Sequence, residues 1–432
     1  MEVIVTPSSG LHGEPKIPPD KSISHRALII GAISKGTSVV HNISRAADPN
    51  STRSCLEALG VRIEDFDSGV KIHGKGLRGL NKPSQVLDAE NSGTTMRMLA
   101  GVLVGQPFES VVTGDASLQR RPMERIIQPL RLMGARIYGT ETLTAPLRIF
   151  PSKELHGITY ELPIPSAQVK SALLLAGLYA EGETAVIENL QTRDHTERYL
   201  GLETERRGMQ RVIRVVGGYQ PQAQVVTIPG DISAAAFFLV AALIVPDSDI
   251  VIRNVGLNPT RLGVLDVLLR MGGAIDILDL RESGGEPVGV LHARSSSLRN
   301  VSIPREIIPN IIDEIPVLAF AATSGEGLFE VRHASDLRNK ESDRIAAIVN
   351  NLRSMGVEVE EYEDGFAFEG PVKLHGTVLS GCRDHRIVMA NALAALRAEG
   401  PTTILEAEYV SISFPEFWSE LRKLTGQSSV KS

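Results

Sequence analysis

Apolar residues follow two different spacings along this chain. Short alternating runs, which are typical of strands, occur at 70–72, 111–113, 225–228 and 250–252. Longer runs that are apolar on nearly every side predict helices at 25–34, 94–104, 167–180, 234–242, 313–322 and 385–396. A helix that is apolar all round belongs in a protein interior. The pattern therefore predicts an α/β protein whose helices are buried and whose sheets face outward.

A repeated phrase marks the ends of several predicted helices: a leucine-rich turn, a glycine and then an alternating strand. Copies begin at Leu56, Leu130, Leu268 and Leu352. A glycine in this place favours the left-handed conformation that ends a helix. Weaker copies near 196–201 and 417–424 would bring the total to six αβ units, three on each side of residue 230.

Two proline-rich segments divide these units. Ile17-Pro18-Pro19-Asp20 lies near the start of the chain, and Ile228-Pro229-Gly230-Asp231 lies near its middle. Proline fixes φ and lacks an N–H group, so such segments end strand pairing and form defined joints. We expect two lobes, residues 19–229 and residues 1–18 with 230–432, joined by a two-strand hinge near 18–20 and 228–231.

Composition narrows the class of protein. A chain of 432 residues exceeds what one hydrophobic core usually supports, and its net charge of −6 argues against a general nucleic-acid or anionic membrane surface. Cys55 and Cys382 are too few for a disulfide framework and lack metal-ligand spacing. No signal peptide, membrane-length apolar run or coiled-coil repeat is evident, so we expect a cytoplasmic monomer.

Polar and cationic residues gather where the apolar helices begin. Lys21 and Ser22 open one helix and Arg26 follows about a turn later, a place where free N–H groups and the helix dipole favour an anion. Gly93 permits close approach of a ligand to the backbone at the start of another helix. Neither segment matches a P-loop or a dinucleotide-binding motif. A capped helix with solvated cations would also explain the first segment, and in the second Arg97 would serve equally well as an internal anchor of the loop.

Three further segments add donors to this set. Arg120 and Arg121 are adjacent, so their side chains diverge and at most one is expected to enter a common site. Ser166 and Gln168 stand at another apolar helix start, and Arg193 lies in a later cation-rich turn. A bland charged loop remains an alternative for the paired arginines.

The second half of the chain supplies carboxylates. Asp313 precedes an apolar helix, where a carboxylate is stabilised in its base-competent form. In the segment 340–344, Lys340 and Arg344 would share one face of a helix, with Glu341 beside them. A solvated helix start would give the same charge pattern.

His385 and Arg386 precede a further apolar helix, and we interpret them as site residues. The candidate set contains cations and proton carriers but no metal ligands, cofactor loop or activated nucleophile. It suits reactions of small polyanions without a metal or cofactor. Because neither predicted lobe holds every cation, we expect closure on ligand.

Six collinear segments together resemble the 5-enolpyruvylshikimate-3-phosphate (EPSP) synthase family: 20–26, 91–97, 114–122, 193–198, 340–344 and 384–386. The resemblance implies transfer of the enolpyruvyl group of phosphoenolpyruvate to the 5-hydroxyl of shikimate 3-phosphate. Phosphate would leave through a tetrahedral intermediate, in the shikimate pathway to chorismate. The implied fold is a two-lobe inside-out α/β barrel of six βαβαββ-type repeats.

The resemblance also implies the roles of individual residues. Shikimate 3-phosphate would be bound by Lys21, Ser22, Arg26, Ser166, Ala167, Gln168, Arg193, Asp313 and Lys340. Phosphoenolpyruvate would be bound by Lys21, Gly93, Arg121, Gln168, Arg344 and Arg386. Asp313 would deprotonate the 5-hydroxyl, Glu341 with Lys21 would transfer the proton at C3, and His385 would join these catalytic residues.

The chain departs from some members of the family near its C-terminus, and Gly93 carries a further expectation. Some members carry a lysine just before a C-terminal Phe-Pro, which the segment 410–415 lacks. Gly93 leaves room beside the phosphoenolpyruvate position, so we expect glyphosate to compete there. The segment 201–210 has no functional interpretation.

Three other readings stay open. UDP-N-acetylglucosamine enolpyruvyl transferases carry a reactive cysteine in a loop that matches 115–123, where this chain has none. The acidic chain disfavours the RNA 3′-phosphate cyclase group. A non-catalytic anion-binding protein would not need Asp313, Glu341 and His385 together.

Overall fold

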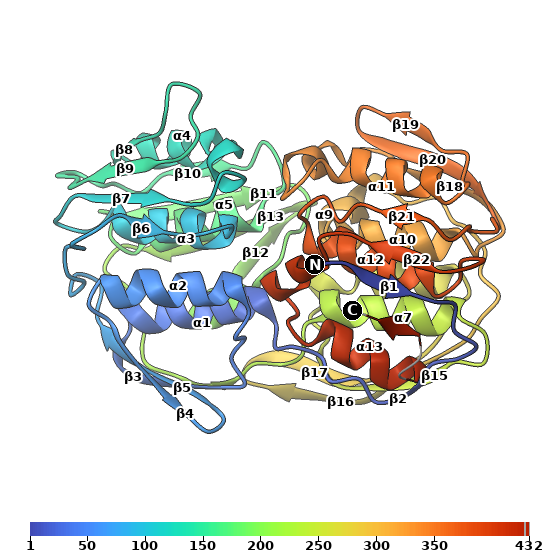
Figure 1. The fold of residues 1–432 in the computed structure, drawn as a ribbon. Helices are drawn as coiled ribbons and strands as arrows, with labels where there is room; N and C mark the ends of the chain where they lie inside the picture. Colours follow the sequence, from blue (N-terminus) through green and yellow to red (C-terminus); the bar gives the residue numbers. More distant parts are fainter. Residues whose placement is uncertain (427–428, 432) are drawn as a thin grey trace. The chain divides into compact units, whose positions relative to one another are not determined.

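The computed structural model describes residues 1–426 and 429–431 (Figure 1). The chain forms two compact units. Unit 1 contains Met1–Pro18, Pro229–Glu282 and Glu286–Ser432, whereas unit 2 contains Pro19–Ile228 and Ser283–Gly285. The chain therefore passes from one unit to the other next to both proline-rich segments.

Unit 2 has three four-stranded sheets. In spatial order they are β14 (Val225–Thr227), β3 (Lys35–His41), β5 (Gly69–Lys75) and β4 (Arg62–Phe66); β6 (Leu87–Asp88), β7 (Ser110–Thr113), β9 (Leu147–Phe150) and β8 (Arg136–Tyr138); and β10 (Thr159–Glu161), β11 (Glu183–Glu188), β13 (Gln210–Val216) and β12 (Thr204–Arg207). Each sheet begins with a parallel pair and continues with two antiparallel pairs.

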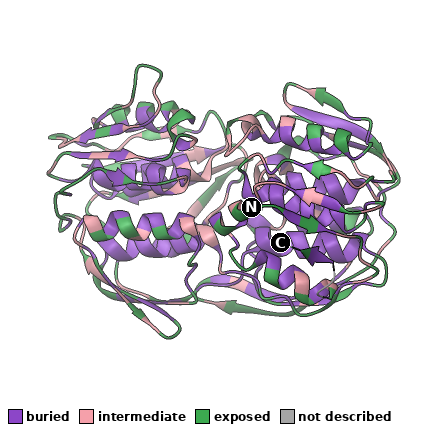
Figure 2. Ribbon diagram, in the orientation of Figure 1, coloured by how far each residue is buried: buried purple, intermediate pink, exposed green. Residues whose placement is uncertain are grey.

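The helices of unit 2 are α1 (Lys21–Ile33), α2 (Ala47–Ala58), α3 (Gly93–Leu103), α4 (Glu124–Leu132), α5 (Ala167–Gly177) and α6 (His195–Leu200), with a 3-10 turn at Leu118–Arg120. Of these, α1, α3 and α5 are buried on nearly every side (Figure 2). This burial explains why their sequences lack a polar face.

The described residues of unit 1 also form three sheets. In spatial order they are β21 (Val378–Leu379), β22 (Thr402–Ile404), β1 (Val3–Val5) and β23 (Val430–Lys431); β16 (Ala274–Ser283), β17 (Glu286–Arg294), β15 (Asp249–Gly256) and β2 (His12–Gly13); and β18 (Gly327–Val331), β20 (Gly365–Gly370) and β19 (Glu360–Tyr362). The first strand of the chain thus pairs with strands near its other end.

The helices of unit 1 are α7 (Ile232–Ile244), α8 (Gly263–Arg270), α9 (Ile308–Ile311), α10 (Ile315–Ala322), α11 (Arg344–Ser354), α12 (His385–Ala395) and α13 (Phe417–Thr425). Its 3-10 turns are Pro259–Arg261, Arg305–Ile307, Ser335–Asn339 and Ala407–Ile412. All 13 residues of α7 are buried, as its uniformly apolar sequence requires. The six helices and four strands predicted from the sequence are confirmed, with boundaries that shift by a few residues.

The glycines of the repeated phrase end helices as predicted. Gly60, Gly134, Gly272 and Gly356 have φ values of 82°, 89°, 88° and 93°. These values lie in the left-handed region that residues with a Cβ atom rarely adopt. In the weaker copy, Gly201 has a φ of 66° and ends α6. The segment 201–210 then contains β12, the turn that follows it and the first residue of β13.

Candidate active site

The first predicted anion segment lies at the start of α1 in unit 2. The Asp20 side chain accepts a hydrogen bond from the Ile23 N–H at 2.8 Å, so the helix begins at Lys21 as predicted. Lys21 Nζ lies 2.8 Å from Asp48 Oδ2 on α2. This ion pair fixes the ammonium group beside the helix start.

Arg26 lies one turn further along α1 and is buried. Its guanidinium donates to the Ser22 carbonyl at 2.9 Å, to Thr196 Oγ1 at 2.7 Å and to Ser171 Oγ at 2.9 Å. Arg193 Nη1 lies 3.4 Å from Ser22 Oγ. The structure thus brings Ser22, Arg26 and Arg193 together.

The starts of α3 and α5 are also joined. Ser92 caps α3 by accepting from the Thr95 N–H at 3.1 Å, and Gly93 is the first helical residue. Gln168 Nε2 donates to Thr94 Oγ1 at 2.9 Å, while Arg97 donates to Gln168 Oε1 at 2.8 Å. Gly93 and Gln168 therefore belong to one hydrogen-bonded platform.

Two other predicted residues border this platform. Ser166 caps α5 and Ala167 is its first residue. Arg121 is buried and donates to Asn91 Oδ1 at 2.8 Å, whereas Arg120 is exposed. The expectation that the adjacent arginines diverge is confirmed. A Cβ atom added at Gly93 would collide with the Arg97 guanidinium and lie 3.4 Å from Arg121 Nη1.

Polar residues of α2 support both segments, although no pattern in the sequence marks them as site residues. Thr52 Oγ1 lies 2.7 Å from His25 Nδ1 and 2.6 Å from Thr95 Oγ1. Burial, together with the charges of Lys21 and Arg26, lowers the pKa of His25 well below its usual value. A neutral imidazole and two hydroxyl groups therefore connect the starts of α1 and α3.

In unit 1 the predicted carboxylates gather on one guanidinium. Arg344 is 1% exposed and donates to Asp384 Oδ2 at 2.8 Å, to Glu341 Oε2 at 2.6 Å and to Asp313 Oδ1 at 3.3 Å. Burial alone would lower the pKa of Arg344, but the three carboxylates, Asp384 foremost, raise it above its ordinary value. The guanidinium is therefore a permanent cation between the two predicted proton carriers.

Arg386 lies on the other side of Asp313. Its Nη1 donates to the Asp313 carbonyl at 3.0 Å, and its Nη2 lies 3.8 Å from Asp313 Oδ2. The same Nη1 lies 3.8 Å from Glu314 Oε1. The structure thus brings Asp313, Glu341, Arg344 and Arg386 together within unit 1.

The prediction of a helical segment 340–344 is wrong. Asp343 caps α11 by accepting from the Ala346 N–H at 3.1 Å, so the helix begins only at Arg344. Lys340 has extended backbone and pairs with Asp336 Oδ2 at 3.1 Å. Lys340 and Arg344 therefore do not share a helix face.

Two further predicted features lie within unit 1. His385 is the first residue of α12, is 1% exposed, and has its Nδ1 atom 3.9 Å from Asp384 Oδ1. In the segment 410–415, Phe414 packs edge-on against Phe238 and Phe417. This segment therefore contributes to the aromatic core of unit 1.

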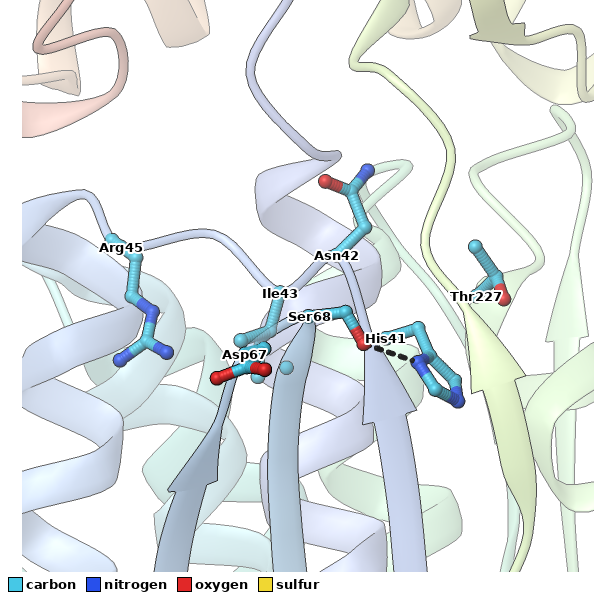
Figure 3. A pocket seen from close by; sticks show the side chains of 8 residues that line it. His41, Asn42, Ile43, Arg45, Asp67, Ser68 and Thr227 are labelled. Carbon is cyan, nitrogen blue, oxygen red and sulfur yellow. Dashed lines mark hydrogen bonds between the residues drawn. The ribbon is translucent and has the colours of Figure 1, made fainter.

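An open cavity of about 600 Å³ in unit 2 contains none of the predicted site residues. It is lined by His41, Asn42, Ile43, Arg45, Asp67, Ser68, Gly69 and Thr227 (Figure 3). His41 Nδ1 lies 2.9 Å from Ser68 Oγ. Arg45 and Asp67 place opposite charges in the lining of this cavity.

Among the residues that the structure describes, no helix combines the length and the apolar character needed to cross a membrane. Within the same ranges, His, Cys, Asp and Glu residues form no group of three or more that could hold a metal ion.

Comparison with known proteins decides the family. Residues 5–421 match the family model described as EPSP synthase (3-phosphoshikimate 1-carboxyvinyltransferase). The chain belongs to the EPSP synthase family. The family resemblance of the six sequence segments is thereby confirmed, as is the prediction that the chain is an enolpyruvyl transferase.

Known members of the family match this chain over nearly its whole length. The 3-phosphoshikimate 1-carboxyvinyltransferase of Salinibacter ruber is 49% identical over 422 residues, covering 97% of this chain and 98% of the relative. That of Carboxydothermus hydrogenoformans is 50% identical over 429 residues, covering 98% of this chain and 99% of the relative.

Solved structures give the same family and the mixed α/β fold. EPSP synthase from Acinetobacter baumannii has a TM-score of 0.86 and 42% identity, covering 100% of this chain and 99% of that chain. The enolpyruvyl transferase NikO from Streptomyces tendae, at 17% identity and a TM-score of 0.76, covers 100% of this chain and 98% of that chain and shares the fold alone.

Proposed function

We propose that this chain transfers the enolpyruvyl group of phosphoenolpyruvate to the 5-hydroxyl of shikimate 3-phosphate and releases phosphate. This is the reaction that leads through the shikimate pathway to chorismate and the aromatic amino acids. The observation that carries the proposal is the grouping of Asp313 and Glu341 on Arg344, beside Arg386. Identity near 50% with named 3-phosphoshikimate 1-carboxyvinyltransferases supports it.

Shikimate 3-phosphate carries a phosphate and a carboxylate, so it needs several fixed donors. Unit 2 would bind it through Lys21, Ser22, Arg26, Ser166, Ala167, Gln168 and Arg193. The contacts of Arg26 and of Arg193 with Ser22 support this assignment, because they hold three of these groups in one place. Unit 1 would add Asp313 and Lys340.

Phosphoenolpyruvate would be bound by Lys21, Gly93, Arg121 and Gln168 of unit 2, and by Arg344 and Arg386 of unit 1. The platform of α3 and α5 holds Gln168 by two hydrogen bonds. Arginine suits this ligand because its planar fork matches carboxylate and phosphate oxygens. The leaving phosphate keeps its charge, which these cations would neutralise.

The chemistry needs one base and one acid. Asp313 would take the proton of the 5-hydroxyl of shikimate 3-phosphate while the hydroxyl oxygen bonds to C2 of phosphoenolpyruvate. Glu341 with Lys21 would deliver a proton to C3 of phosphoenolpyruvate. The tetrahedral intermediate would then return one proton of its C3 methyl group to Glu341 with Lys21, as the C2–O bond to phosphate breaks and phosphate leaves. His385, beside Asp384, is the fourth predicted member of the catalytic set.

The finer architecture is part of the same proposal. Six sheets, with one pairing pattern shared by the three sheets of unit 2, support an inside-out α/β barrel of six repeats. Boundaries at Pro18/Pro19 and Ile228/Pro229 support lobes of 19–229 and of 1–18 with 230–432, hinged near 18–20 and 228–231. The monomeric state and the cytoplasmic location stay predictions.

A coupled assay of phosphate release tests the function. Phosphoenolpyruvate is supplied with shikimate 3-phosphate or with UDP-N-acetylglucosamine, to the native chain and to Asp313→Ala. We expect phosphate release only with shikimate 3-phosphate, and we expect its rate to be lower by about 10³-fold or more in Asp313→Ala. Release only with the sugar nucleotide would assign the rival transferase activity, and ligand binding without turnover would indicate an anion-binding protein.

A further inference from the structure

Lys170 is a buried cation to which the proposed mechanism gives no role. It lies in the first turns of α5, and its side chain is 0% exposed. An ammonium group without a partner would be strongly disfavoured in such a place. Its surroundings therefore show what the residue does.

Two carboxylates hold the Lys170 ammonium group. Nζ lies 3.0 Å from Glu188 Oε2, at the end of β11, and 2.6 Å from Glu197 Oε1, on α6. Both glutamates are themselves buried, with side chains 2% and 4% exposed. The cluster, defined here as Lys170, Glu188 and Glu197, joins three separate elements of unit 2.

The cluster fixes both ends of the segment that presents Arg193. Glu188 Oε2 accepts from the Thr192 N–H at 3.3 Å and from Thr192 Oγ1 at 2.8 Å, directly before Arg193. Glu197 lies four residues after Arg193, in the first turn of α6. Lys170 thus attaches the Arg193 segment at two points to α5.

The same end of α5 presents the second group of proposed ligands. Ser166 caps the helix and Gln168 lies two residues before Lys170. Directly after Lys170, Ser171 Oγ lies 2.6 Å from Thr196 Oγ1, so a hydroxyl contact also joins α5 to α6. The separation between Gln168 and Arg193 is therefore set by Lys170 and its neighbours.

We infer that Lys170, held by Glu188 and Glu197, is a positioning residue that sets Arg193 against Ser166 and Gln168 for binding shikimate 3-phosphate. The inference rests on the proposed function, and Lys170 itself does not touch the substrate. A buried ion pair with a purely structural role would change only stability when replaced. A positioning role changes the KM for one substrate and leaves the other nearly unaltered.

The test replaces one cation and one anion, so that the net charge stays constant. Lys170→Met with Glu197→Met fills the same space with apolar side chains, and Glu188 keeps its contacts with Thr192. We expect the KM for shikimate 3-phosphate to rise about tenfold or more, with the KM for phosphoenolpyruvate within about threefold. Should the double variant fail to fold, Glu197→Gln is expected to give the same split at smaller amplitude.

Arg211→Met is the matched control. Arg211 Nε lies 3.7 Å from Glu188 Oε1, but the two residues face each other on paired strands of one sheet. Their contact does not join α5 to the Arg193 segment. We therefore expect this variant to leave the KM for shikimate 3-phosphate within about twofold.

Hydrogen–deuterium exchange of segment 189–194 provides a second readout on the full chain without substrate. Faster exchange in the double variant than in Arg211→Met is expected. Equal KM values for shikimate 3-phosphate in native and variant chains, with unchanged exchange, would overturn the inference. Absence of turnover in the native chain would instead overturn the proposed function, since the native chain has the cluster intact.

Discussion

The two units hold their proposed ligand-binding arginines in different surroundings. In unit 2, Arg26 donates to hydroxyl and carbonyl oxygens, and Arg121 donates to an amide oxygen. In unit 1, Arg344 donates to three carboxylates. Neutral acceptors fix a guanidinium without cancelling its charge, whereas carboxylates neutralise it and gain a fixed position in return. The contacts of Arg26 and Arg121 thus leave their charge for a ligand, whereas Arg344 also holds the two predicted proton carriers, Asp313 and Glu341.

We expect the largest effect from replacing Arg344. Replacing it in Arg344→Met leaves Asp384, which is 0% exposed, and two further carboxylates without their shared cation. We expect a loss of about 3 to 5 kcal/mol in the free energy of unfolding, together with loss of turnover. Urea denaturation measures the first effect. A stability loss below about 1 kcal/mol would show that the carboxylates do not depend on Arg344.

Replacing Arg121 in unit 2 is expected to cost less stability than replacing Arg344 in unit 1. Arg121→Met removes the donor to two neutral acceptors, Asn91 Oδ1 at 2.8 Å and Ser117 Oγ at 3.4 Å. We expect only about 1 to 2 kcal/mol of lost stability but a KM for phosphoenolpyruvate raised by about 10- to 100-fold. Steady-state kinetics and denaturation on the same preparation test this. The comparison would not survive equal stability losses in Arg121→Met and Arg344→Met.

Gly93 tests how closely a ligand approaches the α3 start. In Gly93→Ala the new methyl group collides with the Arg97 guanidinium, which must shift, and it comes into van der Waals contact with Arg121 Nη1 at 3.4 Å. We expect the KM for phosphoenolpyruvate to rise about tenfold, with the KM for shikimate 3-phosphate little changed.

Glyphosate is expected to compete with phosphoenolpyruvate in the native chain and to inhibit Gly93→Ala less. Inhibition assays at limiting phosphoenolpyruvate measure both effects. Unchanged turnover of the native chain at saturating glyphosate would contradict this expectation.

His25 gives the smallest effect, in stability rather than activity. Its pKa in the folded chain lies well below the ordinary value, because of burial and the neighbouring Lys21 and Arg26. Below about pH 6.5 the unfolded chain therefore binds a proton that the folded chain does not, and stability falls by up to about 1.4 kcal/mol per pH unit. His25→Gln should reduce the difference in unfolding free energy between pH 7.5 and 5.5. An unreduced difference would mean that other groups dominate acid sensitivity.

Much of the fold could be predicted because burial leaves a plain mark on the sequence. The α7 segment is apolar all round and is buried all round. The glycines that end helices could also be located, because a left-handed residue at a helix end favours glycine. Both signals are local, and each concerns a few adjacent residues.

Local pattern failed where a side chain redirects the backbone or pairs over a distance. Asp343 caps α11, which turned the expected helix at 340–344 into an irregular segment. The site contact of Arg344 with Asp384 spans 40 positions, and that of Thr52 with Thr95 spans 43. Periodicity carries no information on such pairs, so the supporting residues of α2 were missed.

The central claim is that Glu341, held by Arg344, transfers the proton at C3. The most direct test is incorporation of solvent deuterium at C3 of phosphoenolpyruvate and product, with shikimate 3-phosphate present, in the native chain and in Glu341→Gln. We expect incorporation by the native chain and a reduction of about 10²-fold or more in the variant, with shikimate 3-phosphate binding retained. Incorporation by Glu341→Gln at the native rate would contradict it.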